Sequence, residues 1–92
     1  MTNRVPTTVL WYSRITEFAM RALCKRQQNG DSLVEINLDE LLEDFNRYWT
    51  NFRYGKEYFL RDLNRFQNTN NYITISDQTI SLTQKGRENC TY

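Results

Sequence analysis

Hydrophobic side chains recur at helical spacing along the first third of the chain. Pro6 and the threonines after it supply a helix start signal, and Gly30 supplies a stop. Between them, apolar residues stand at i, i+4, i+7 and i+11, which places them on one helix face: Trp11, Ile15, Phe18 and Ala22. The pattern predicts an amphipathic helix over residues 8–28.

A short β-branched segment and two more helical patterns follow. Residues 32–36 are bounded by turn residues and predict a brief strand. Asn37 with Glu40 three positions later resembles a capping box, which predicts a second helix ending near residue 48. A third helix over residues 52–67 is predicted from apolar residues at i, i+4 and i+7: Phe59, Leu63 and Phe66.

The last third of the chain alternates between apolar and polar residues. Segments 72–76 and 79–83 each show the period of two that is typical of strands. Asp77 and Gln78 lie between them, so the pattern predicts a β-hairpin. The turn lacks glycine, and a four-residue connection over 76–79 fits as well as a two-residue one. Thr83 is placed to cap a short terminal turn.

The order helix, strand, helix, helix, hairpin predicts an α+β fold with three helices against a small three-stranded antiparallel sheet. Residues 72–88, which end in Lys85-Gly86-Arg87-Glu88, resemble the wing and its exit in small prokaryotic and viral winged helix-turn-helix transcriptional regulators. The resemblance implies one winged-helix domain over residues 1–92, with a core at about 8–88 and short flexible tails. It also implies that the third helix enters the DNA major groove and that the wing touches the backbone or the minor groove.

The polar face of the third helix carries the side chains that such contacts require. Arginine binds guanine or phosphate, asparagine binds adenine, and glutamate accepts from cytosine. Asp62 stands beside Arg61 and is placed to pair with it, and the wing has no Lys or Arg over residues 72–84. We therefore expect sequence-specific double-stranded DNA binding with little help from the wing, through these residues: Arg53, Lys56, Glu57, Arg61, Asn64, Arg65 and Gln78.

The charge distribution keeps other partners open. Twelve Lys and Arg against eleven Asp and Glu leave a net charge of +1, which is low for a phosphate-binding protein. Residues 31–44 hold six carboxylates and no cation. The alternative is a winged-helix protein–protein interaction module that uses this acidic second helix or the apolar first helix. A third reading is single-strand binding through Tyr54 and Tyr58. A homodimer through the first helix would use Trp11, Tyr12 and Ile15.

Absent residue types narrow the chemistry. The chain has no histidine, which removes the commonest general base and the commonest zinc ligand. We therefore expect no enzymatic activity, no metal and no cofactor. Cys24 and Cys90 do not form a disulfide framework; we expect the first in the core and the second as a free thiol in a mobile tail. No membrane-length apolar run or signal sequence is present, which predicts a cytoplasmic location and no membrane partner.

Overall fold

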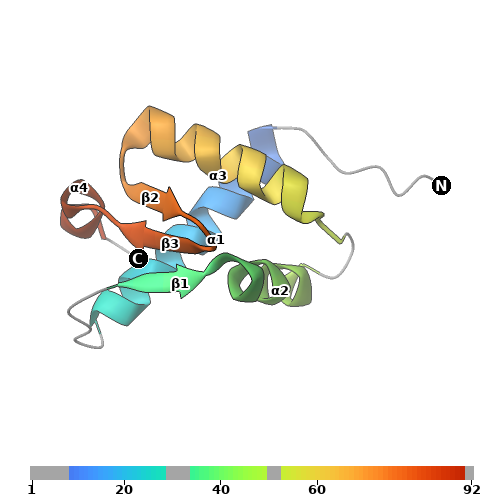
Figure 1. Cartoon of the computed structure of the whole chain (residues 1–92), viewed down its shortest axis with the longest axis horizontal. Coiled ribbons are helices and arrows are strands. Elements are labelled where there is room, and N and C mark those ends of the chain that lie inside the picture. Colours follow the sequence, from blue (N-terminus) through green and yellow to red (C-terminus); the bar gives the residue numbers. More distant parts are fainter. Residues whose placement is uncertain (1–8, 29–33, 50–52, 91–92) are drawn as a thin grey trace.

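The computed structural model describes residues 9–28, 34–49 and 53–90. In chain order the elements are α1 (Val9–Gln28), β1 (Glu35–Asn37), α2 (Leu38–Tyr48), α3 (Lys56–Asn70), β2 (Ile73–Ser76), β3 (Thr79–Leu82) and α4 (Gln84–Glu88) (Figure 1). The predicted α+β fold is confirmed, and the order is compatible with a winged helix-turn-helix topology. The described residues contain four helices rather than the predicted three, because α4 follows the hairpin.

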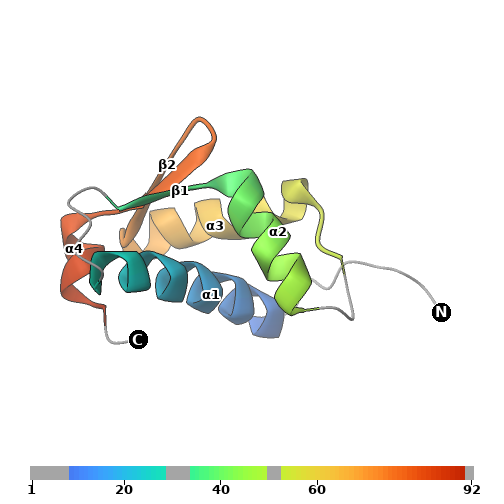
Figure 2. The ribbon, with the colours of Figure 1, turned by 90° about the horizontal axis from the view of Figure 1, so that it is seen from below.

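The other helices pack against one side of α1, and the sheet lies beside them. Figure 2 shows α1 along one side of the molecule, with α2 near one end of it and α4 at the other. The antiparallel sheet has the order β1-β3-β2. Ile80 on the central strand pairs with Ile36 on one side and Ile75 on the other. The predicted pairing of the short strand with the hairpin is therefore confirmed; residues 32–33 of that prediction lie outside the described residues.

The core side of α1 is wider than the predicted stripe. Trp11 is 7% exposed and Ile15 is fully buried, so the prediction that these two residues form a dimer surface is wrong. Tyr12 is half-buried, and the Arg65 guanidinium lies 4.8 Å from the centroid of its ring. Phe18 is only partly buried, at the margin of the core. The side chain of Phe18 therefore remains partly available at the surface.

A buried asparagine fixes the connection between α2 and α3. The Tyr54 backbone N–H donates to Asn46 Oδ1 at 2.6 Å, and Asn46 Nδ2 donates to the Tyr54 carbonyl at 3.0 Å. These bonds hold the chain before α3 extended, so the helix begins at Lys56 with Gly55 as its N-cap. The prediction that residues 53–55 belong to the helix is therefore wrong, and residue 52 lies outside the described residues. The helix ends at Asn70, three residues later than predicted, because Asn71 adopts the left-handed conformation with φ 60°.

The two capping predictions are confirmed, and the hairpin turn has two residues. Asn37 Oδ1 accepts from the Asp39 and Glu40 N–H groups, and Thr83 Oγ1 accepts from the Gly86 N–H. In the turn, Asp77 has φ 53°, a conformation that Asp adopts more readily than most residues. The Leu38 N–H donates to the Gln78 carbonyl at 2.7 Å, which ties the turn to the start of α2.

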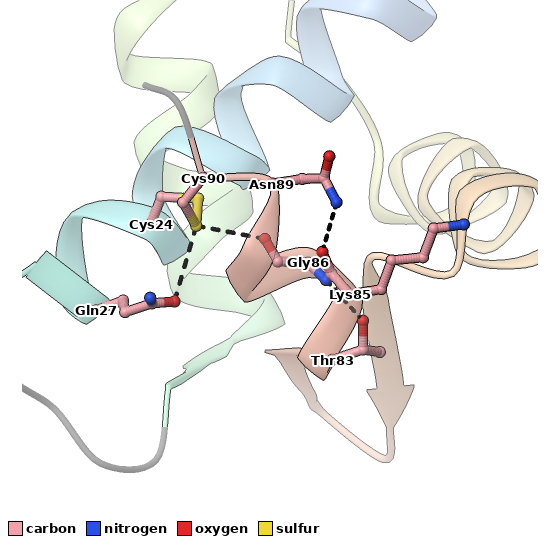
Figure 3. The surroundings of a disulfide bond; sticks show 7 residues. All are labelled: Cys24, Gln27, Thr83, Lys85, Gly86, Asn89 and Cys90. Atoms are coloured by element: carbon pink, nitrogen blue, oxygen red, sulfur yellow. Dashed lines mark hydrogen bonds between the residues drawn. A yellow bond between two sulfur atoms is a disulfide. The ribbon is translucent and has the colours of Figure 1, made fainter.

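A disulfide joins the C-terminal segment to α1. Cys24 and Cys90 are bonded, 66 positions apart in sequence, so the prediction of a free Cys90 thiol in a mobile tail is wrong. Figure 3 shows Cys90 Sγ beside α4, at 3.5 Å from the Gly86 carbonyl oxygen. Cys24 is fully buried, as predicted. Residues 1–8 and 91–92 of the predicted tails lie outside the described residues. Within the described ranges no helix has the length and apolarity that a membrane crossing needs.

Candidate nucleic-acid interface

The predicted division of α3 into two faces is confirmed. Phe59, Leu63 and Phe66 are buried. The helix has 15 residues, or a length of about 22 Å, and it presents its polar face along this whole length. The exposed residues are Glu57, Tyr58, Arg61, Asn64, Arg65, Asn68 and Thr69. Asn68 was not among the predicted contacts, although it stands at helical spacing from Asn64 and Arg61.

Three residues that were predicted to contact DNA form contacts within the protein instead: two cations pair with α2, and Gln78 bonds to one of them. Arg53 forms an ion pair with Glu43 at 2.9 Å, and Lys56 forms one with Asp39 at 2.9 Å. Lys56 Nζ also donates to Gln78 Oε1 at 2.8 Å, which links the hairpin turn to the start of α3. The cations at this end of α3 are therefore locally neutralised.

The other carboxylates of α2 are paired in the same way. Glu40 lies 3.3 Å from Arg26 of α1, and Asp44 lies 3.0 Å from Arg47. All these pairs are at the surface, where each contributes at most about 1 kcal/mol to stability. Their main consequence is electrostatic: the four carboxylates of α2 are balanced by cations of α1, of α2 itself and of the segment that begins α3. This balance could have been suspected from the opposite charges of neighbouring segments.

Arg61 lies at the middle of the exposed face. Its Nε is 3.3 Å from Asp62 Oδ1, as the sequence suggested, and its guanidinium lies 5.1 Å from the Tyr58 ring centroid. The Arg61 side chain remains 48% exposed. Asp62 itself is buried, and the Tyr54 hydroxyl donates to its Oδ2 at 3.5 Å. Asp62 and the Tyr58 ring therefore orient the Arg61 side chain, and its exposed part can contact a ligand.

Tyr54 provides a pH test of this buried arrangement. Burial, and then the negative charge of Asp62, raise the pKa of Tyr54 from 10.0 to about 12. The unfolded chain therefore ionises first as the pH rises, and stability falls between pH 10 and about 12. We expect a loss of up to about 2 kcal/mol from this residue. In urea unfolding across this range, Tyr54→Phe is expected to have the shallower pH dependence; equal slopes in both proteins would refute the assignment.

The α3 face from Arg61 to Asn68 carries a net positive charge. Among the described residues no carboxylate lies within ion-pair distance of Arg65, whose contact is the Tyr12 ring. Asn64 and Asn68 flank Arg65 and are exposed. Arg61, Asn64, Arg65 and Asn68 thus form a polar row. Its net positive charge comes from Arg65, because Arg61 is paired with Asp62. Glu57 and the neutralised pairs lie at the opposite end.

The hairpin adds no cation to this surface. Asp77 is exposed at its tip. Among the described residues, no group of three or more His, Cys, Asp or Glu side chains could hold a metal ion. Comparison with protein-family models, with curated proteins and with solved structures found no match to this chain.

Proposed function

We propose that this protein binds double-stranded DNA through the exposed face of α3 from Arg61 to Asn68 and acts as a small transcriptional regulator. The observation that supports this most is the row Arg61, Asn64, Arg65 and Asn68 on one solvent-exposed helix face. The major groove accepts one α-helix, and a helix of this length is long enough to place several side chains against base edges. The position of α3 after α2 and before the hairpin is the position of the recognition helix in winged helix-turn-helix proteins.

Each side chain in this row has a defined role in the proposal. Arg61 and Arg65 bind guanine edges or phosphates, and Asn64 and Asn68 read adenine. Asp39 and Glu43 pair with Lys56 and Arg53, so the start of α3 offers phosphate little net positive charge. The middle and the C-terminal part of the helix are therefore proposed to make the groove contacts. Two copies on two half-sites would double these contacts, without a dimer interface at Trp11 or Ile15.

The test is a pair of charge-matched double variants. Arg61→Ala with Arg65→Ala is expected to weaken duplex binding more than tenfold, because it removes both cations of the row. Arg21→Ala with Lys25→Ala removes the same charge from α1 and is expected to weaken binding less than about threefold. Asp77→Ala is expected not to weaken it. Fluorescence-anisotropy titrations of one labelled duplex measure all three.

Equal losses in the two double variants would contradict the assignment to α3. They would show that binding follows net charge rather than one face. No structural observation favours docking of a basic partner on α2, since its carboxylates already pair with cations of this chain.

For the location we propose the cytoplasm, where duplex DNA is available to a bacterial or viral regulator. Stable disulfides are rare in reducing compartments, so the Cys24–Cys90 bond opposes this proposal. The protein's thiols can be trapped in the host cell with an alkylating reagent before lysis. This experiment distinguishes a reducing compartment from one in which the disulfide persists. Alkylation of both cysteines supports a reducing compartment, and protection of both contradicts it.

A further inference from the structure

A surface groove of about 430 Å³ lies between α1 and the C-terminal end of α2. None of the residues proposed for DNA binding lines it. Its lining combines aromatic rings with cations. Figure 2 shows α1 on the side of the molecule away from the tip of the β2–β3 hairpin.

The aromatic part of the groove is partly open to solvent. Tyr48 is 67% exposed. Its ring centroid lies 5.8 Å from that of Phe18 and 5.2 Å from that of Trp49. These contacts keep an apolar ring at the surface in a fixed position, against the side of the core. An exposed ring held in this way is a common anchor point for a partner's apolar side chain.

Cations line the same groove along α1. Arg14, Arg21 and Lys25 follow one another at i, i+7 and i+11, over a length of about 16 Å. The Arg14 guanidinium lies 4.3 Å from the Trp49 ring centroid. Glu17 is the one carboxylate of the lining, and it lies 3.6 Å from Arg21 in an exposed pair. The lining therefore has two more positive charges than negative ones.

We propose that this groove binds an acidic amphipathic helix of another protein. Apolar residues of such a helix at i, i+3 or i+4, and i+7 would pack on Phe18, Tyr48 and Trp49. Its carboxylates would pair with Arg14, Arg21 and Lys25. The length of the cationic row matches about three turns of helix. The groove thus provides a route by which a DNA-bound copy recruits a protein.

Charge complementarity selects this occupant over two others. A second copy docked on the same face would bring two positively charged grooves together, which is unfavourable. A nucleic-acid strand would place phosphates against Glu17 as well as against the cations. An acidic helix offers its carboxylates to the cations and the unpaired N–H groups of its first turn to Glu17, so it can satisfy both kinds of lining residue.

The experiment uses the full chain in its oxidised form and a synthetic probe. The probe is a labelled peptide of about 15 residues with Leu at i, i+4, i+7 and i+11 and Glu at most other positions. A scrambled peptide of the same composition is the sequence control. Anisotropy gives the affinity, and amide chemical shifts in an NMR titration locate the contact. We expect the shifts to concentrate on α1 and on Tyr48 and Trp49, with tighter binding of the amphipathic peptide than of the scrambled one.

Matched variants make the proposal specific to the groove. Tyr48→Ala and the pair Arg21→Glu with Lys25→Glu are expected to weaken peptide binding more than tenfold. Tyr58→Ala removes an exposed aromatic from α3 and is expected to leave it unchanged. Circular dichroism confirms that each variant is folded. Duplex affinity is measured in parallel, so that failure of this proposal and failure of the DNA-binding proposal are seen separately.

Four results would overturn the proposal. These are a peptide Kd weaker than about 1 mM, equal affinity for the scrambled peptide, preferential binding of an oligothymidylate in the same groove, or self-association that the Arg21→Glu with Lys25→Glu pair abolishes. The third result would assign the groove to single-stranded nucleic acid and the fourth to a second copy of the chain.

Discussion

Replacement of Gly86 by alanine is expected to lower the free energy of unfolding by about 3 kcal/mol or more, because an added Cβ has no space. Gly86 is buried in α4, and its Cβ would overlap the carbonyl oxygen of Tyr72 and come within 2.9 Å of Leu82 Cδ2. The Tyr72 carbonyl belongs to the backbone and accepts from the Thr83 N–H at 3.0 Å. It therefore cannot shift without breaking this hydrogen bond. Urea unfolding monitored by tryptophan fluorescence measures the loss.

Gly55 supplies the matched control. A Cβ built there meets Tyr58 Cδ2 at 3.9 Å, which is ordinary van der Waals contact, and its φ of −79° suits any residue. We expect Gly55→Ala to change stability by less than about 1 kcal/mol. If Gly86→Ala were as stable as Gly55→Ala, the close packing of α4 against the hairpin would be refuted.

Loss of the Cys24–Cys90 bond is the second large expected effect. The bond closes a loop of 66 residues, and the chain-entropy model gives a stabilisation of about 4 kcal/mol for a loop of that size. Measured values are often smaller, so we expect reduction to lower the free energy of unfolding by about 2–4 kcal/mol. This is a large share of the stability of a chain of this length. Thermal unfolding with and without a reductant measures it.

Cys90→Ser separates the bond from other effects of the reductant. The variant is expected to match the reduced wild-type protein and to be insensitive to added reductant. An unchanged melting temperature of the wild-type protein on reduction would contradict the disulfide. Because Cys90 follows α4 directly, we also expect local hydrogen exchange in α4 to increase most.

Much of the fold could be predicted from the sequence, because its signals are local. Helical spacing predicted α1, and Asn37 and Thr83 were correctly predicted as N-caps. The alternation of apolar residues located β2 and β3. These features depend on residues within a few positions of one another, so the local sequence pattern is sufficient to predict them.

The remaining features depend on contacts between distant residues. Asn46 fixes the backbone of Tyr54 and thereby sets the first residue of α3, which no helical pattern reveals. Cys24 and Cys90 pair only because α4 folds back onto α1. Trp11 and Ile15 are buried in the wide core face of α1. Their spacing alone was equally consistent with a dimer surface.

The candidate site divides in the same way. Its exposed face on α3 could be predicted from spacing, because Phe59, Leu63 and Phe66 define the opposite side. The pairing of Arg53 and Lys56 with the carboxylates of α2 could not, because it depends on how two helices cross. This pairing moves the expected DNA contacts toward Arg61 and Arg65 and accounts for a positively charged row on a nearly neutral chain.

The central claim is that α3 binds duplex DNA through Arg61 and Arg65. Anisotropy titration of a mixed-sequence duplex at about 50 and 200 mM salt, with wild-type protein and the Arg61→Ala, Arg65→Ala double variant, tests it most directly. We predict that wild-type affinity falls at least tenfold over this range and that the double variant binds more weakly with a shallower salt dependence. Absence of duplex binding at the lower salt concentration, or a double variant indistinguishable from wild type, would contradict it.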